Sequence, residues 1–447
     1  MDRKYALSPS EHLPFRPIHY LGSKLRILDA VIGSIRDAAP KGRAVDLFSG
    51  SGTVAHSLSR ERPVIAVDIQ EYARVLANAL FIGGAAGLTT PSRDQLLRSS
   101  PELQVVLDCI KPLIKYEASL EQAAATGSFE RLADFLAECP LLTLPAQGVR
   151  TPASVEVLHD TVRRLREADL WGAPQTLALR HFGGVYFSFA QAFEIDLLLN
   201  FAHRKSGSAR DVAVGAVLSS ASHAVSSIGK QFAQPISLRT RAGQYKPHVV
   251  EKLLQERNKS VHAHFAAAVE RFNASEGRPT SRAERADYRE FLARRDEEYS
   301  VIYADPPYTR DHYSRYYHVL ETLALRDEPM ITQSNLGDAR PSRGVYRANR
   351  HQSPFSIRSQ APDAFRQLFA LARRHDCPLV LSYSPFDKAA GSHPRTIDLS
   401  TLADLAHGQF ASVRIVSAGA FRHSKLNSRS RALRASSEAE QIFICSP

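Results

Sequence analysis

Cysteine is scarce in this sequence, and the cysteines that occur are scattered. There are four of them, and no two form a Cys-x-x-Cys pair (Cys109, Cys139, Cys377 and Cys445). This spacing argues against a disulfide framework and against a cysteine-rich zinc site, and it favours a reducing compartment. We therefore expect no structural metal.

Long apolar runs are also missing. No stretch approaches the 18 or so uninterrupted apolar residues of a membrane span, and the first ten residues lack the apolar core of a signal peptide. We therefore expect a cytoplasmic protein with no membrane partner. An apolar fraction of 44% over 447 residues is ordinary for a globular protein and is enough for two domains.

Acidic residues are outnumbered by basic ones, which gives a formal net charge of +11. A positive excess of this size favours a polyanionic partner such as nucleic acid. It is a weak indication by itself, because many basic enzymes bind no DNA.

The strongest local pattern is a run of β-branched and aromatic residues that ends in two prolines. Residues 299–304 carry no charge and predict a buried strand. Pro306 and Pro307 end it at once, because neither can donate to a sheet ladder. Asp305 is then expected at the carboxyl end of a core strand, where open α/β sheets bind ligands, and Tyr308 follows it.

This arrangement suits methylation of an exocyclic amine on a nucleobase. The lone pair of such an amine is delocalised into the ring, so the nitrogen is a poor nucleophile. The Asp305 carboxylate and the Pro306 carbonyl could accept hydrogen bonds from the amine, and Tyr308 could stack on a base flipped out of the duplex. An Asp-Pro-Pro turn after any strand has the same sequence, so the tetrapeptide alone leaves both interpretations open.

A second pattern near the amino terminus is typical of a nucleoside-binding turn. Residues 43–48 predict a strand, residues 49–55 have G-x-G-x-x-A spacing, and residues 64–68 predict a second strand that ends in Asp68. The glycines permit a tight turn with a close backbone approach, and Asp68 can accept hydrogen bonds from ribose hydroxyls. This β-α-β unit predicts a site for a nucleoside cofactor.

Strand and helix stop alternating between residues 84 and 297. Helical patterns dominate there, among them one at 248–272, and they predict an inserted, mainly helical domain. Alternation resumes afterwards, with predicted strands at 378–383, 411–418 and 440–445. We expect a catalytic domain in two parts, 1–83 and 298–447, around an insertion at 84–297.

Two segments are rich in basic residues and predict loops: residues 332–360, and the stretch between the last two predicted strands. Arginine interleaved with small polar residues suits contacts to phosphate groups, although a solvated loop has the same composition. The candidate DNA-binding residues are Arg310, Arg343, Arg347, Arg350, Lys425, Arg429 and Arg431.

Four segments in one order resemble the Dam-like (alpha) class of adenine-N6-specific DNA methyltransferases. They are Tyr20-Leu21-Gly22-Ser23-Lys24, the glycine-rich stretch from Asp46 to Gly52, the long insertion, and Asp305-Pro306-Pro307-Tyr308. The segments at 182–188 and 313–321 also resemble bacterial members. The resemblance covers most of the chain and is least recognisable over residues 85–175.

The resemblance implies a doubly wound, Rossmann-like α/β sheet of seven strands and an inserted target-recognition domain. It also implies S-adenosylmethionine as methyl donor and an adenine in double-stranded DNA as acceptor. The implied catalytic residues are Asp305, Pro306, Pro307 and Tyr308. The implied cofactor-binding residues are Tyr20, Gly22, Lys24, Asp46, Phe48, Gly50, Gly52 and Asp68. Among them Lys24 would neutralise the cofactor carboxylate and Asp68 would hold the ribose.

The resemblance further implies a restriction-modification or phage-defence setting, with a cognate endonuclease or defence-system component as partner. The insertion is longer than the short recognition domains of Dam-like enzymes, so the recognised sequence does not carry over.

Other classes fit less of the sequence. A dehydrogenase that binds NAD shares the glycine-rich turn but does not explain Asp305 to Tyr308. A cytosine-C5 methyltransferase needs a nucleophilic cysteine after proline, whereas here the order is Cys139-Pro140 and Cys377-Pro378. A cytosine-N4 or RNA or protein-amide methyltransferase could use a related tetrapeptide and remains the alternative. A non-enzymatic DNA-binding protein is disfavoured by the intact motifs, and cofactor binding would separate it from an enzyme.

Overall fold

The computed structural model describes residues 15–144, 153–240, 242–310, 312–333, 342–384, 395–418 and 440–447. The chain forms two compact units, each assembled from segments that are separate in the sequence. The first, called here the sheet unit, combines the chain up to Ala85 with Ala274–Ser314 and His351–Pro447. The second, the helical unit, consists of Ala86–Asn273 and Arg315–Arg350.

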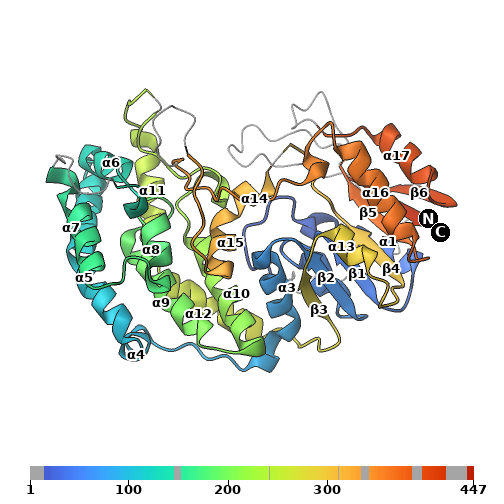
Figure 1. Ribbon diagram of the computed structural model, residues 1–447, viewed down its shortest axis with the longest axis horizontal. Helices are drawn as coiled ribbons and strands as arrows, with labels where there is room; N and C mark the ends of the chain where they lie inside the picture. The colour runs from blue at the N-terminus through green and yellow to red at the C-terminus, as the bar shows by residue number, and fades with distance from the viewer. Residues whose placement is uncertain are drawn as a thin grey trace. The chain divides into compact units, whose positions relative to one another are not determined.

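A seven-stranded sheet is the framework of the sheet unit (Figure 1). Its order is β3-β2-β1-β4-β5-β7-β6. Neighbouring strands from β3 to β5 pair in parallel, whereas β7 runs antiparallel to both β5 and β6. This confirms the predicted mixed α/β class and the mostly parallel sheet. The strands are Ala44–Leu47 (β1), Val64–Asp68 (β2), Arg282–Arg285 (β3), Val301–Ala304 (β4), Leu379–Tyr383 (β5), Ser412–Ser417 (β6) and Gln441–Ser446 (β7).

Helices cover both faces of the sheet (Figure 1). Side chains alternate along each strand, so Ile302 packs into the core on one face and Tyr303 into the core on the other. Because both faces are covered, the central strands are mostly apolar, and this is why the sequence predicts them clearly. The first core includes α13 (Tyr288–Ala293), α16 (Ala361–Arg373) and α17 (Leu399–His407); the second includes α1 (Leu28–Ala38), α2 (Thr53–Leu58) and α3 (Glu71–Ile82).

The order of the strands reverses between β1 and β4. β1 pairs with β2 on one side and with β4 on the other, so that Asp46 lies opposite both Ala66 and Tyr303. The connections leaving the carboxyl ends of β1 and β4 diverge at such a switch point, and a crevice opens between them. The residues that follow the two strands, Phe48 and Asp305, are therefore delivered to the same end of the sheet.

Residues 274–297 belong to the sheet unit, which corrects their expected place in the insertion at 84–297. They contain β3, which pairs in parallel with β2. Its sequence, Arg-Ala-Glu-Arg, has no β-branched or aromatic residue, and its side chains at the edge of the sheet are partly exposed. An edge strand of this composition has no apolar pattern to detect. The expected second catalytic segment, 298–447, is also divided, because residues 315–350 pack within the helical unit.

The centre of the helical unit consists of two largely buried helices, α9 (Phe189–His203) and α10 (Gly207–Ala224). The single helix expected at 248–272 is two helices, α11 (Val250–Arg257) and α12 (Val261–Asn273). Among the described residues, no helix combines the length and the apolar character needed to cross a membrane. The remaining main helices are α4 (Arg93–Arg98), α5 (Pro101–Ala125), α6 (Glu130–Ala137), α7 (Ala153–Glu167), α8 (Leu177–Phe182) and α15 (His318–Leu325).

Candidate active site

A cavity opens at the carboxyl ends of β1, β2 and β4 in the sheet unit. It is lined by segments that lie far apart in the sequence and meet only because of the strand order. Nine of the predicted site residues line it: Tyr20, Gly22, Lys24, Phe48, Asp68, Asp305, Pro306, Pro307 and Tyr308. The structure thus brings the Asp-Pro-Pro-Tyr segment and most of the expected cofactor residues to one place.

Three predicted residues lie behind the cavity wall. Asp46 is 1% exposed within β1, and its Oδ2 has no hydrogen-bond partner among the described residues. Gly50 has φ of +53°, and a Cβ there would overlap the Tyr20 hydroxyl. Gly52 packs against Ala77 of α3, where a Cβ would come within 3.0 Å of the Ala77 Cα. The two glycines therefore allow the turn to form and to pack closely.

Asp68 holds the glycine-rich turn through its carboxylate. The Gly50 amide donates to Oδ2 at 3.0 Å, and the Gln70 amide donates to Oδ1 at 2.9 Å. Burial raises the pKa of Asp68, and the bonds from these amides act in the opposite direction. Each carboxylate oxygen has a second lone pair, so Asp68 can hold the turn and still accept a bond from a ligand.

Lys24 lies between two carboxylates at the centre of the site. Its Nζ is 2.9 Å from Asp305 Oδ1 and 2.9 Å from Glu440 Oε1. The Tyr308 hydroxyl is 3.5 Å from the same ammonium and donates to Glu440 Oε1 at 3.4 Å. The predicted role of Lys24, neutralising a cofactor carboxylate, is not tested by these contacts, which give the ammonium two carboxylates of the protein itself.

Burial and the neighbouring charges shift the pKa values of Asp305 and Lys24. Burial raises the pKa of Asp305 to about 6; the Lys24 ammonium opposes this shift and the Glu440 carboxylate adds to it. Although burial disfavours its charged form, Lys24 has a pKa above the usual range because Asp305 and Glu440 lie beside it. At neutral pH the cluster therefore holds a lysine cation and an aspartate that is mostly ionised.

The Tyr308 ring is fixed from several sides. Its centroid lies 5.3 Å from that of Tyr383 at an angle of 59°, and the Arg395 guanidinium lies 5.2 Å from the Tyr308 centroid. The Thr396 amide donates to the Tyr308 carbonyl at 3.2 Å. These contacts hold an aromatic ring next to Asp305 before any base is present.

Aromatic side chains also flank the cofactor motif. Phe48 has φ of +61°, which is unusual outside glycine, and this directs the chain sharply after β1. Its ring centroid is 5.4 Å from those of Tyr288 and Phe355. The same wall includes Gln70, whose Oε1 is buried without a partner among the described residues.

The candidate DNA-binding residues are divided between the two units and the part of the chain that is not described. Arg310 is exposed in the sheet unit, and Arg343, Arg347 and Arg350 belong to the helical unit. Lys425, Arg429 and Arg431 lie outside the described residues.

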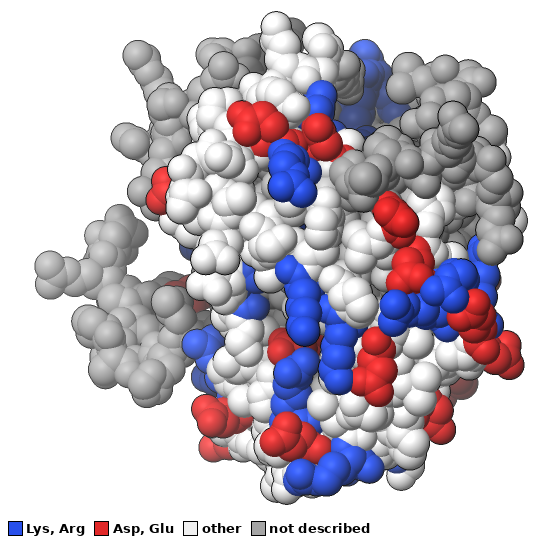
Figure 2. Space-filling model, turned by 90° about the vertical axis from the view of Figure 1, so that its left-hand side faces the viewer, with Lys and Arg blue, Asp and Glu red and all other residues white. Residues whose placement is uncertain are grey.

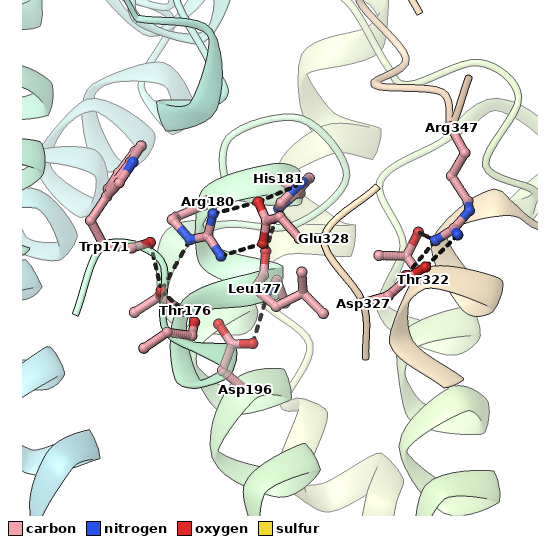
Figure 3. Close-up of polar contacts among 12 residues, drawn as sticks. Trp171, Thr176, Leu177, Arg180, His181, Asp196, Thr322, Asp327, Glu328 and Arg347 are labelled. Atoms are coloured by element: carbon pink, nitrogen blue, oxygen red, sulfur yellow. Dashed lines mark hydrogen bonds and ion pairs between the residues drawn. The ribbon is translucent and has the colours of Figure 1, made fainter. Parts of the chain in front are cut away.

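Arg347 is engaged within the helical unit (Figure 3). Its Nη1 and Nη2 each donate to the Asp327 carboxylate at 2.6 Å, and Nη1 donates to Thr322 Oγ1 at 3.1 Å. Figure 3 also shows the neighbouring Glu328, which accepts two bonds of 2.7 Å from the buried Arg180. These paired contacts hold the segment after α15 in place. The ion pair between Arg347 and Asp327 was not indicated by the sequence.

Arg350 and Arg315 lie against Tyr346 in the helical unit. Their guanidinium carbons are 5.2 Å and 4.6 Å from the Tyr346 ring centroid, and Arg315 Nη2 donates to the Tyr346 hydroxyl at 3.1 Å. Arg343 is exposed. Arg315 and Arg350 thus share the Tyr346 ring, and neither has an acidic partner within the described part of the chain.

Sequence reasoning missed Glu440, Gln70 and Arg315. Glu440 immediately precedes β7, and only the strand order reveals that this end of β7 lies beside the end of β5. A carboxylate before a predicted strand was the available signal, but it belongs to no motif. In the described part of the chain, no group of three His, Cys, Asp or Glu side chains is arranged to hold a metal ion.

Comparison with known families agrees with this geometry. The family model for D12 class N6 adenine-specific DNA methyltransferases matches residues 20–86 and 252–376. The two matched segments contain the glycine-rich turn, Asp68 and the Asp-Pro-Pro-Tyr segment, and the unmatched stretch between them lies within the helical unit. A search of curated proteins finds no match. Over these segments the chain is similar to the D12 class N6 adenine-specific DNA methyltransferases, and this similarity supports methylation of the N6 amine of adenine in DNA as its activity.

Proposed function

We propose that the cavity of the sheet unit is where the target adenine and the methyl donor meet, with Asp305 as the group that activates the amine. The observation that carries this proposal is the position of Asp305 after β4, in one cavity with Asp68, Phe48 and Tyr308. The Asp305 side chain keeps 21% of its surface exposed, so it is accessible from the cavity.

The family implies S-adenosylmethionine as methyl donor, and the residues present fit it. Gln70 Oε1 is a buried acceptor without a partner among the described residues, and Asp68 has lone pairs to spare. The cofactor carries ribose hydroxyls and an ammonium group, which are donors that such acceptors require. Phe48 offers an aromatic face suited to an adenine ring. When bound, the cofactor supplies a methyl group on a sulfonium, which an amine can attack.

The role proposed for Asp305 follows from charge. Its carboxylate accepts a hydrogen bond from the adenine amine, and the Pro306 carbonyl accepts the second amine hydrogen. These bonds favour the pyramidal nitrogen, whose lone pair is no longer shared with the ring. As the nitrogen becomes positively charged, its attraction to the carboxylate grows, so Asp305 stabilises the transition state more than the ground state.

The role proposed for Tyr308 is to receive the flipped base. Its ring is already held by Tyr383 and Arg395, so little side-chain freedom is lost when a base stacks on it. Stacking of this kind contributes about 1–3 kcal/mol per base. The ordered ring thus offsets part of the cost of taking adenine out of the duplex.

We assign target recognition to the helical unit, Ala86–Asn273 with Arg315–Arg350, rather than to residues 84–297. Figure 2 displays the molecule from the side of α5, α6 and α7, where basic and acidic side chains are interspersed. Many of them pair along the helices, as Arg163 does with Glu167 and Lys111 with Asp108. That face is a poor candidate for DNA, whereas the Arg315 and Arg350 pair on Tyr346 and the exposed Arg343 suit phosphate groups.

Expression in a host without DNA methylation tests the proposal. Base-resolution mapping should show N6-methyladenine in one sequence context, and an Asp305→Ala variant made to the same level should leave the DNA unmodified. Methylation at cytosine N4, or modified RNA with unmodified DNA, would overturn it. If the methylation protects DNA from a cognate endonuclease, as we also propose, plasmids modified by the chain should resist an endonuclease of the same specificity.

A further inference from the structure

The buried glutamate at the start of β7 has no part in the motifs of the sequence. Glu440 is 3% exposed, and its Oε1 contacts both the Lys24 ammonium at 2.9 Å and the Tyr308 hydroxyl at 3.4 Å. Its backbone is also held, because the Ala418 amide donates to the Glu440 carbonyl at 3.0 Å. A carboxylate kept this far from water is stabilised only by such partners.

The position of Glu440 changes the charge of the catalytic cluster. Lys24 and Asp305 alone form a neutral ion pair, in which the ammonium competes with any other donor for the Asp305 oxygens. With Glu440 as a second partner at an equal distance, the ammonium is shared and the cluster of three charges has a net charge of −1. The attraction to a developing cation is stronger for a net negative group than for a neutral pair.

We propose that Glu440 is a positioning residue for methyl transfer: it draws Lys24 away from exclusive pairing with Asp305 and keeps the cluster negatively charged. This inference rests on the proposed role of Asp305. It also explains why Glu440 contacts Tyr308, since one carboxylate then orients the ammonium and the tyrosine that receives the base.

Several charged or titratable groups lie near the cluster and affect the pKa values of its members. Glu440 is the carboxylate that raises the pKa of Asp305, against the opposing effect of Lys24. The remaining neighbours come from β1, from β4 and its continuation, and from the segment after β5; they are Asp46, Tyr303, Tyr308 and Arg395. Removing the Glu440 charge should therefore lower the pKa of Asp305 as well as the rate.

The test is single-turnover methyl transfer to DNA as a function of pH, with Glu440→Gln compared with the wild type. The substitution keeps the shape of the side chain and removes its charge. We expect the rate on the neutral plateau to fall by about tenfold or more, which is below the loss typical of a group in direct contact with the reacting atoms. The acidic limb of the profile should move to lower pH, while cofactor affinity in calorimetry stays within about twofold.

Matched variants separate this role from a structural one. Glu61→Gln removes a glutamate that pairs with Arg36 on the surface, through a 2.8 Å bond from Arg36 Nε, and should leave both rate and profile unchanged. Glu440→Asp keeps the charge and should keep the acidic limb at the wild-type pH with a rate closer to wild type. If Glu440→Gln does not fold, Glu440→Asp still tests the inference, because a displaced limb in that variant would contradict it.

The outcomes discriminate between the two proposals. A wild-type profile in Glu440→Gln, or a lower plateau with an unmoved acidic limb, would overturn the role of Glu440. Near-normal transfer by Asp305→Ala would instead overturn the proposed mechanism on which it rests. Loss of transfer in Asp305→Ala together with the displaced limb in Glu440→Gln supports both.

Discussion

Lys24 Nζ lies 2.9 Å from Asp305 Oδ1, although the two residues belong to separate motifs of the sequence. The contact joins the Tyr-x-Gly-x-Lys segment to the end of β4 in the same unit. It gives the lysine a partner within the protein, the carboxylate that we propose to be catalytic.

Methyl transfer should lose activity as the solution is acidified through about pH 6. Burial raises the pKa of Asp305 to about 6, and only the ionised carboxylate can stabilise a positively charged amine. Because the folded-state pKa lies above the ordinary value for aspartate, the active form is present above pH 6 and is lost below it. Single-turnover rates between pH 5 and 8 at saturating DNA measure this limb. A rate that is flat down to pH 5 would contradict the assignment of Asp305.

Asp68→Ala should weaken cofactor binding while the protein remains folded. Asp68 lies at the end of β2, where it accepts bonds from the Gly50 and Gln70 amides, and its removal affects both the turn and the proposed ribose contact. Loss of one charged hydrogen-bond partner should cost roughly 1.5–3 kcal/mol of binding free energy. Titration calorimetry gives the affinity, and circular dichroism reports folding. Unchanged affinity would remove Asp68 from the site.

Asp68→Asn is the matched variant for that prediction. The amide oxygen can still accept one backbone bond, so the turn should be better preserved than in Asp68→Ala. Cofactor affinity intermediate between the wild type and Asp68→Ala would show that the carboxylate acts partly through the turn.

Arg343 and Arg347 should respond differently to neutralisation. Arg343 is exposed, and its replacement by Gln should lower the slope of log K for DNA binding against log salt by about 0.9, the value for one lost phosphate contact. Arg347 is already paired with Asp327, so Arg347→Gln should leave the slope unchanged and lower the melting temperature. The test is a series of DNA-binding titrations at salt concentrations from about 50 to about 200 mM. Equal slopes for the wild type and Arg343→Gln would show that Arg343 is only solvated.

The sequence predicted the parts of this protein that have strong local patterns. β1, β2, β4 and β5 are buried on both faces, so their apolar runs identified them, and the prolines after β4 marked its end. β3 was missed because its pairing with β2, rather than its own composition, makes it a strand. The boundaries of the units were missed for a similar reason. Segment 315–350 belongs to the helical unit because of the residues it packs against, and its position in the chain does not indicate this.

For the candidate site as well, the sequence predicted residues that belong to motifs and missed residues that do not. Residues in motifs, such as Asp68 and Asp305, were predicted because the chemistry requires those residue types at those positions, and both line the cavity. Glu440 was not found, because it reaches the site through a strand order that no local pattern encodes. Gln70 was missed although it follows Asp68 closely, because it belongs to no motif. The pairing of Arg347 with Asp327 was also hidden, since a basic loop looks the same in sequence whether its arginines are free or paired.

The central claim is that Asp305 acts in the transition state, and Asp305→Ala tests it most directly. Single-turnover transfer of labelled methyl groups to DNA should be abolished, whereas cofactor affinity measured separately should stay close to that of the wild type, because the role is confined to the amine. Asp305→Asn keeps a hydrogen-bond acceptor without the charge and should retain partial activity. Near-normal methyl transfer by Asp305→Ala, with the cofactor bound as tightly as before, would contradict the account.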